Sequence, residues 1–186
     1  MKFIELESER LAYRKFVEND FSVLFDWVGN AENMKYREGP LGEAKARGYL
    51  NFLISCTSTE DINHCEYAVV RKVDNKLIGS AVLMHLPDEP EIGWTLHRDY
   101  WRQGYGTEMG RAMLRLGFDE LNYHRITSKC HALNIASYKI MERIGMRREA
   151  YFVKCTKANS LFNDEWCDEV QYAILQEEWI AAKDRR

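Results

Sequence analysis

The sequence has 186 residues, of which 46% are hydrophobic and 30% are charged. These fractions are close to the averages of globular proteins and exclude a disordered chain, a collagen-like repeat and a coiled-coil rod. The net charge of −3 gives no electrostatic basis for a nucleic-acid-binding protein. No segment approaches the roughly 18 apolar residues that span a bilayer, and Glu5 is too early an acidic residue for a signal peptide. We therefore expect one cytoplasmic domain over residues 1–186, with no nucleic-acid or membrane partner.

The five cysteines form no C-x-x-C pair, and their spacing matches neither a disulfide framework nor a zinc site. They stand at positions 56, 65, 130, 155 and 167. We expect free thiols in a reducing compartment, and no metal.

The first half of the chain predicts strands and two helices. Apolar residues at helical spacing follow Asn19, which makes this residue a candidate helix cap. The turn pair Asp74-Asn75 separates two strand-like runs, which favours a hairpin. The predicted elements are a strand over 6–16, a helix after Asn19, a helix over about 43–56, and hairpin strands over 66–70 and 77–84.

The second half adds strands and two amphipathic helices. From Gly104 onward, apolar residues recur at i, i+3, i+4 and i+7, which predicts a helix to about Leu121 that begins in a glycine turn. The other predicted elements are strands over 91–96 and 125–130, a helix from Asn134 to the terminator Gly145, and strands over about 147–156 and 166–175. This order predicts an α/β (α+β) fold, with a mixed sheet and helices on both faces.

The segment from Tyr100 to Thr107 joins a predicted strand to a predicted helix and holds Gly104 and Gly106. The first N–H groups of a helix have no partner within it and carry the positive end of the helix dipole, so such a turn can bind phosphate with its backbone alone. Glycines allow an anion to approach without a Cβ in the way. A tight turn without a ligand is the simpler alternative, and the spacing matches neither a Walker loop nor G-x-G-x-x-G.

The residues around this turn, over 91–109, resemble the acetyl-CoA motif of the GNAT N-acetyltransferases. Residues 134–137 and 142–149 resemble the second motif of the same superfamily. The opening run 6–11 resembles the start of the branch that includes the bacterial ribosomal-protein alanine and serine N-acetyltransferases. The resemblance implies a mostly antiparallel sheet of about seven strands, splayed between the fourth strand and the fifth, with acetyl-CoA in the gap.

The resemblance also implies how the cofactor is held. Acetyl-CoA is the expected co-substrate, its pyrophosphate lies on backbone N–H groups of the glycine turn, and no metal takes part. Its pantetheine arm pairs with the open edge of the strand over 91–96, as a peptide would. The expected cofactor-binding residues are Thr95, Leu96, His97, Arg102, Gln103, Gly104, Tyr105, Gly106, Thr107 and Asn134.

Two positions depart from the superfamily pattern. Trp101 stands where Gln or Arg is common, which is a feature of the ribosomal-protein branch. Met141 stands where many members carry a tyrosine that protonates the leaving thiolate, and a thioether has no proton to donate. The resembled branch implies Ser137 as the general acid instead. The alternative is that Ser137 is an ordinary hydroxyl at a helix start, with Tyr138 or water as the proton source.

The general base must take a proton from the attacking ammonium, and three residues are candidates: Glu91, His85 and His97. Glu91 is the expected catalytic base, because it shares a face of its strand with Gly93 and Thr95. Its alternative role is that of an exposed carboxylate at a strand end.

The expected reaction is direct attack of a primary amine on the acetyl carbonyl. An α-amine has a pKa of about 7.7–8.0 against about 10.4 for lysine, so it demands less of the base. We therefore expect a protein or peptide N-terminus as the acceptor. The alternatives are a small amine (polyamine, amino acid or aminoglycoside) or a non-catalytic acyl-CoA sensor.

The resemblance implies that two regions shape the acceptor pocket: the helical region 19–56, including Trp27, Met34, Tyr36 and Arg37, and the final hairpin near Phe162 to Trp166. A polycation would be favoured if the loop carboxylates converge on this pocket. These carboxylates are Glu60, Asp61, Asp88, Glu89 and Glu91. The chain is expected to be a monomer or a homodimer.

Overall fold

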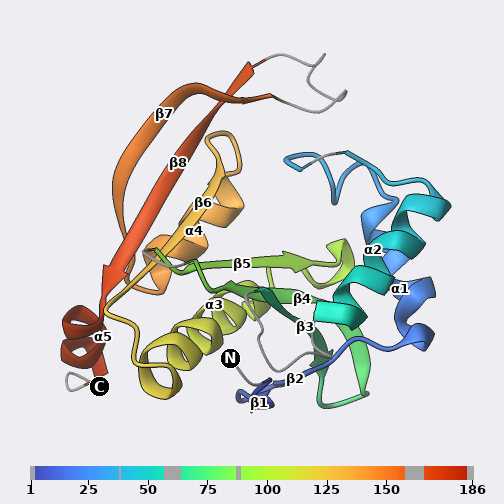
Figure 1. Cartoon of the computed structure of the whole chain (residues 1–186), viewed down its shortest axis with the longest axis horizontal. Coiled ribbons are helices and arrows are strands. Elements are labelled where there is room, and N and C mark those ends of the chain that lie inside the picture. Colours follow the sequence, from blue (N-terminus) through green and yellow to red (C-terminus); the bar gives the residue numbers. More distant parts are fainter. Residues whose placement is uncertain (1–2, 38, 57–63, 87–88, 158–165, 184–186) are drawn as a thin grey trace.

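The computed structural model describes residues 3–37, 39–56, 64–86, 89–157 and 166–183. Within these ranges, eight strands form one sheet in the order β1-β2-β3-β4-β5-β6-β8-β7 (Figure 1). The strands are β1 (Leu6–Glu7), β2 (Leu11–Arg14), β3 (His64–Arg71), β4 (Lys76–Met84), β5 (Glu91–Leu96), β6 (Arg125–His131), β7 (Arg147–Lys157) and β8 (Trp166–Leu175). Neighbouring strands are antiparallel except β5 and β6. This mixed, mostly antiparallel sheet confirms the predicted fold class.

Helices cover both faces of the sheet. They are α1 (Phe21–Val28), α2 (Glu43–Cys56), α3 (Tyr105–Arg115), α4 (Ile135–Arg143) and α5 (Gln176–Lys183). Short 3-10 turns at Glu18–Asp20 and Arg98–Tyr100 precede α1 and α3, and a wider π-helical turn, Leu116–Glu120, continues α3 to the predicted end of that helix. Among the described residues, no helix combines the length and apolar character needed to cross a membrane.

The opening segment differs from its prediction, and the strand count differs with it. Residues 6–16 were expected to form one strand, but they form the two short strands β1 and β2, joined by a turn at Ser8 to Arg10. The Ser8 N–H donates to the carbonyl of Leu11 at 2.8 Å and closes this turn. The polar run between apolar residues therefore folds back on itself, which gives eight described strands where about seven were expected.

The turn at Asn75 and the helix end at Gly145 agree with their predictions, whereas the cap of α1 and the presence of α5 do not. Asn75 occupies the left-handed region of the β3–β4 turn, and Gly145 ends the second amphipathic helix with φ +97°. The cap of α1 is Asp20 and not Asn19, and the Asp20 carboxylate accepts hydrogen bonds of 2.7 Å from the guanidinium of Arg14. Helix α5 was not predicted, since it buries no residue and shows no apolar periodicity.

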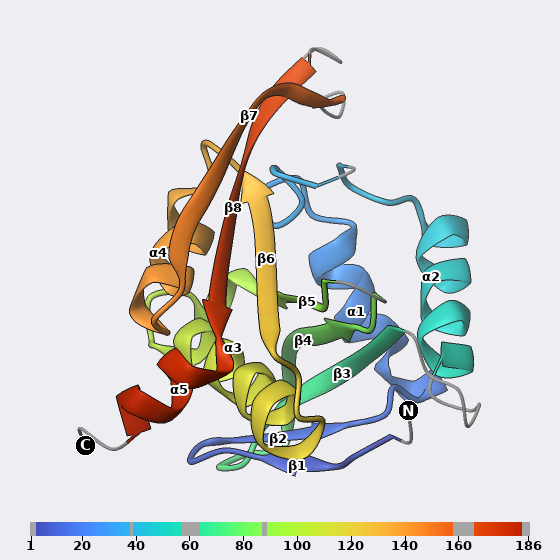
Figure 2. The same ribbon diagram turned by 60° about the vertical axis from the view of Figure 1, so that its left-hand side comes forward.

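The sheet splits between β5 and β6, the predicted fourth and fifth strands. In the described part of the chain these two strands share one paired position, Glu91 with Thr127. A hydrogen bond of 2.8 Å from the Thr127 N–H to the carbonyl of Pro90 closes the join. Beyond it, β6, β8 and β7 turn away from β5 (Figure 2). The predicted splay is therefore present, and it leaves one edge of β5 open.

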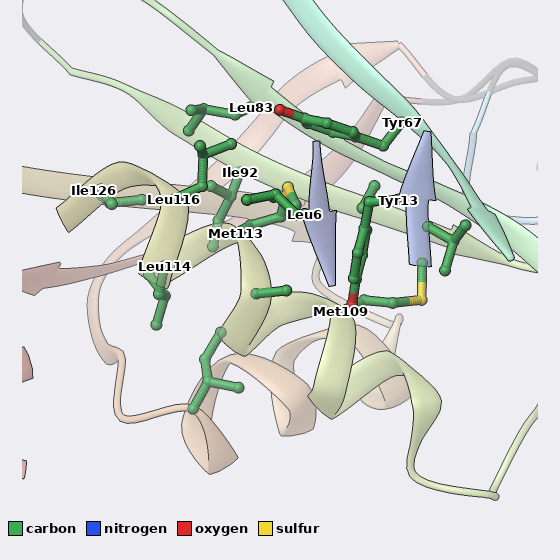
Figure 3. Packing of buried hydrophobic residues seen from close by; sticks show 14 of the residues in the cluster. Leu6, Tyr13, Tyr67, Leu83, Ile92, Met109, Met113, Leu114, Leu116 and Ile126 are labelled. Carbon is green, nitrogen blue, oxygen red and sulfur yellow. The ribbon is translucent and has the colours of Figure 1, made fainter. Parts of the chain in front are cut away.

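Each face of the sheet has its own apolar core. On one face, Tyr67, Ile92 and Met113 pack between the sheet and α3 (Figure 3). On the other face, a second cluster that includes Trp27 and Leu50 joins α1 and α2 to β3 and β4. Because side chains alternate along a strand, the even positions of β3 face α1 and α2.

The α3-side core predicts a large effect of truncation at Ile92, which is 1% exposed. Ile92→Ala should lower the free energy of unfolding by about 2–5 kcal/mol, because it removes buried methyl groups and leaves a cavity. Val73→Ala is the matched control, since Val73 is 83% exposed and its loss should cost less than about 0.5 kcal/mol. Urea unfolding measures both. Similar losses for the two variants would contradict this assignment of the core.

Candidate active site

A cavity of about 520 Å³ occupies the gap between β5 and β6 and extends over the α1–α2 face of the sheet. Strands β3, β4 and β5 form its floor, and β6 with the start of α4 forms one wall. The loop between α1 and α2, which faces β6 and α4 across the sheet in Figure 1, forms the opposite wall. The rings of Tyr36 in this loop and His131 at the end of β6 lie 5.2 Å apart. The cavity therefore joins the expected cofactor gap to the expected acceptor side.

The open edge of β5 presents a defined set of backbone groups. The His97 N–H donates to Ile78 on β4 at 2.8 Å. Hydrogen-bonded pairs alternate along an antiparallel ladder, so the backbone of Thr95 also faces β4, and that of Trp94 and Leu96 faces the gap. Of the three residues predicted to pair with the pantetheine arm, Leu96 has its backbone groups on the open edge of β5. The backbone of Thr95 and His97 faces β4 instead, and Trp94 is a further residue whose backbone faces the gap.

The carbonyl of Leu96 accepts two side-chain hydrogen bonds in this gap. The Trp101 indole N–H and the Asn33 amide each donate to it at 2.8 Å. Trp101, the position that departs from the superfamily pattern, thus links the glycine turn to β5 by a hydrogen bond. Asn33 links the α1–α2 loop to the same Leu96 oxygen.

Glu91 lines the cavity on the same face of β5 as Gly93 and Thr95, as predicted. Burial raises the pKa of its carboxyl group, the charge of Lys129 opposes this effect, and Glu169 and Glu89 add to it. The Lys129 Nζ lies 3.8 Å from the carboxylate. Glu91 therefore sits at the reaction gap with a proton affinity higher than that of an exposed glutamate.

The two histidine candidates lie elsewhere. The ring of His85 stacks on Tyr123 at 5.5 Å and bonds to its hydroxyl group. His97 is buried, and its Nε2 lies 2.7 Å from a carboxylate oxygen of Asp26. Neither ring contributes to the cavity wall, so Glu91 is the one of the three base candidates that the structure brings to the gap.

The start of α4 forms the wall opposite β5. Asn134 and Ser137 both line the cavity, and Asn134 caps the helix by accepting a hydrogen bond of 3.2 Å from the Ser137 N–H. The Ser137 side chain hydrogen-bonds Cys130, whose thiol pKa burial raises to about 11. Met141 is fully buried in the α3-side core, so this position offers no proton donor, as expected.

The glycine turn has a backbone shape that few side chains tolerate. Arg102 and Gly104 both lie in the left-handed region, with φ of 59° and 83°, and Gly104 is the cap of α3. At Gly106, a Cβ would lie 2.6 Å from Cδ1 of Ile140 on α4. Gly106 thus allows α3 and α4 to approach each other at the turn.

The other predicted residues of the turn support its shape. Gln103 donates from Nε2 to the carbonyl of Asp99 at 2.9 Å. The guanidinium of Arg10 stacks over the buried ring of Tyr105, with its carbon 4.3 Å from the ring centroid. Gly104 and Thr107 line a second cavity of about 580 Å³ beside the turn. Its wall also carries the arginines Arg10, Arg111, Arg115 and Arg143.

The acceptor side holds two charged residues, of which Arg37 was expected from the sequence and Glu66 was not. Glu66 is 5% exposed and lines the cavity floor, where its carboxylate accepts a hydrogen bond of 2.9 Å from the Tyr49 hydroxyl on α2. Arg37, in the α1–α2 loop, donates to the Thr95 hydroxyl on β5. Glu66 lies in a buried strand far from Arg37 in sequence, and its segment alone gives no signal of a site.

Of the expected loop carboxylates, Glu89 and Glu91 lie within the described residues. Glu89 accepts hydrogen bonds from Arg125 at 3.2 Å and from Gln171 at 3.0 Å. Glu60, Asp61, Asp88 and Phe162 lie outside the described residues. No group of three or more His, Cys, Asp or Glu side chains within the described ranges is placed to hold a metal ion.

Comparison with known proteins identifies the family. Residues 10–147 match the model of the acetyltransferase (GNAT) domain. The chain is 35% identical to YnaD of Bacillus subtilis, an uncharacterised N-acetyltransferase, over 95% of this chain and 99% of that one. A GNAT-family acetyltransferase of Bacillus anthracis, known from its crystal structure, superposes with a TM-score of 0.82 and 34% identity, over 94% of this chain and 99% of the other.

A more distant structure supports the fold alone. The ribosomal-protein-S5-alanine acetyltransferase of Vibrio fischeri superposes with a TM-score of 0.79 at 17% identity, over 95% of this chain and 99% of that one. The chain belongs to the GNAT family of N-acetyltransferases, as its motifs predicted. It is an acyltransferase of a family that uses acetyl-CoA and acts on amines.

Proposed function

We propose that this enzyme transfers acetyl from acetyl-CoA directly to the α-amine of a protein or peptide N-terminus. The observation that carries the proposal is the position of Glu91, a partly buried carboxylate on the reaction gap with a raised pKa. A base of this strength suits an α-amine, whose pKa of about 7.7–8.0 leaves a fraction neutral at physiological pH.

The cofactor arm would pair with the gap-facing backbone of Trp94 and Leu96. The Leu96 carbonyl already accepts two hydrogen bonds, so the N–H of Leu96 and the backbone of Trp94 are the groups assigned to the pantetheine amides. The pyrophosphate would lie on the N–H groups of residues 102–107, at the positive end of α3. The arginines of the second cavity add positive charge beside the turn.

Glu91 would take the proton of the acceptor amine through water, and Ser137 would protonate the departing thiolate from the opposite wall. Cys130 lies next to Ser137, but a thiol with a pKa of about 11 is protonated at neutral pH and is a poor nucleophile. Direct attack by the amine is therefore favoured over an acetyl-cysteine intermediate.

Charges of both signs line the cavity in the described part of the chain. Three carboxylates and three cationic side chains lie there, so these residues do not create the strongly negative field that favours a polycation. The carboxylates are Glu66, Glu91 and Glu169, and the cations are Arg37, Lys129 and Lys157.

The experiment that tests the proposal measures release of free CoA thiol with a panel of amines. The panel holds short peptides with a free N-terminus, the same peptides with a blocked N-terminus, free amino acids and polyamines. Turnover with the unblocked peptides supports the proposal. Preference for polyamines would assign a small-molecule substrate, and acetyl-CoA binding without turnover on any amine would indicate a sensor.

The shape of the glycine turn predicts how substitutions alter cofactor affinity. Gly104→Val should weaken acetyl-CoA binding more than Arg102→Ala, because a β-branched residue cannot adopt φ of 83° without strain while the Arg102 cation is auxiliary. Calorimetry in the presence of a chelator measures both, and binding there should need no metal. A larger effect of Arg102→Ala, or no binding by the wild type, would contradict the assignment.

The role of Glu91 predicts a pH profile. Its carboxylate must be ionised to accept a proton, and burial raises its pKa, so kcat/KM should rise with pH along a limb centred above the ordinary glutamate value of about 4.3. Glu91→Gln should remove this limb and lower kcat by about 10²-fold or more. Glu89→Gln is the control, which should keep the limb and move it to lower pH because a like charge is lost. An unchanged profile in Glu91→Gln would exclude this base.

The role of Ser137 predicts a loss confined to the chemical step. Ser137→Ala should lower kcat by about 10²-fold and leave the affinity for acetyl-CoA nearly unchanged, as expected when a transition-state interaction is removed. Ser137→Thr keeps a hydroxyl group and should retain more of the rate. Stopped-flow measurement of thiol release separates this step from product release. Activity of Ser137→Ala within about twofold of wild type would leave Tyr138 or water as the acid.

A further inference from the structure

A cationic side chain stands over the acceptor side of β5. Arg37 lines the cavity from the α1–α2 loop, and its Nη1 donates to the Thr95 hydroxyl group. The side chain is solvent-exposed even though it faces the cavity. A guanidinium is planar and matches a carboxylate with paired donors, so its charge at this position favours an acidic group on the acceptor.

A buried carboxylate on the cavity floor interacts electrostatically with this cation. Glu66 lies on the α1–α2 face of the sheet, where burial raises the pKa of its carboxyl group but hydrogen bonds from His64 and Ser80 and the charge of Arg37 bring it below its ordinary value. Tyr49 on α2 donates to the same carboxylate at 2.9 Å. An ionised, buried carboxylate therefore sits under the acceptor floor, close enough to attract the guanidinium.

Glu66 itself is a poor candidate for direct contact with an acceptor ammonium. Its side chain is 5% exposed and accepts hydrogen bonds from Tyr49 and His64, the latter at 3.2 Å. Glu66 forms part of the cavity floor, whereas Arg37 lies exposed on the cavity wall. Glu66 is thus a positioning residue for Arg37.

The spacing along β5 sets how far the acidic group lies from the amine. Glu91 and Thr95 are four residues apart on one face of the strand, a span of about 13 Å. A row of hydrogen-bonded groups between Glu91 and Arg37 would have nearly the same length, roughly 11–12 Å. It runs from the Glu91 carboxylate through a bridging water to the amine nitrogen, and then through the acceptor carboxylate to the Arg37 guanidinium. This length holds when the acceptor carboxyl carbon is two or three bonds from the nitrogen.

From this geometry we infer that Arg37 selects acceptors that carry a carboxylate two or three bonds from the reacting amine. This inference rests on the proposed function and names the chemical class of its acceptor. Two sources supply such a group. The side chain of an N-terminal aspartate in a peptide agrees with the proposed function, whereas the α-carboxylate of a free amino acid would replace the peptide of that proposal with a small α-amine.

Matched acceptors that differ by one charge provide the test. One pair is alanine and alaninamide, and the other is Asp-Ala-Ala-amide and Asn-Ala-Ala-amide. Each is assayed for kcat and KM with the wild type, Arg37→Gln, Arg37→Lys and the control Arg47→Gln. Arg47 is an exposed arginine on α2 that pairs with Glu43 at 2.8 Å and does not line the cavity.

The wild type should prefer the carboxylate member of at least one pair by about 10-fold or more in kcat/KM, and the pair that responds identifies the source. Arg37→Gln should lose about 10- to 100-fold on that member, mainly through KM, with little change on its amide. Arg37→Lys should recover part of the preference, and Arg47→Gln should behave as the wild type.

Three results would overturn the inference, and they have different meanings. Equal kcat/KM within both pairs for the wild type would show that no carboxylate is recognised, while the proposed function stands. Equal losses on both members in Arg37→Gln would show that Arg37 only shapes the loop. Absence of turnover with every acceptor would contradict the proposed function itself, and the inference with it.

Discussion

The single paired position between β5 and β6 is the constraint on which the rest of the site depends. A strand whose backbone is satisfied on one side and open on the other normally invites pairing with another chain. Here the join at Glu91 and Thr127 keeps the two halves of the sheet together, while the remaining length of β5 stays open toward the gap. In the proposed function, the same strand supplies a backbone edge for the cofactor arm and, on its face, side chains for the acceptor.

Burial and hydrogen bonding give similar residues different properties around this gap. Glu91 and Glu66 are both glutamates on the cavity, but burial dominates at Glu91 and raises its pKa, whereas surrounding donors lower that of Glu66. One is suited to exchange a proton, and the other to remain charged and hold a cation. The division follows from the number of donors around each carboxylate, since the residue type is the same.

Local signals in the sequence were sufficient for most of the fold. Apolar periodicity located α3 and α4, and the terminator Gly145 adopts the left-handed conformation that its position implied. The sequence placed Arg37 and Thr95 in the site but did not predict Glu66 or the contact between Arg37 and Thr95, because the three residues come from separate elements and meet only when the sheet has formed. It also gave no sign that Gly106 makes room for Ile140 on a neighbouring helix. Sequence spacing shows what a segment can do alone, and it contains no direct signal for contacts between distant segments.

The carbonyl of Leu96 joins two parts of the molecule that are far apart in sequence. Trp101 belongs to the turn that would bind the nucleotide end of the cofactor, and Asn33 belongs to the loop that carries Arg37, yet both donate to this one oxygen atom. A carbonyl oxygen has two lone pairs, so it can accept both hydrogen bonds at once. One backbone atom of β5 therefore sets the spacing between the turn and the wall of the cavity, the two regions assigned to the two substrates.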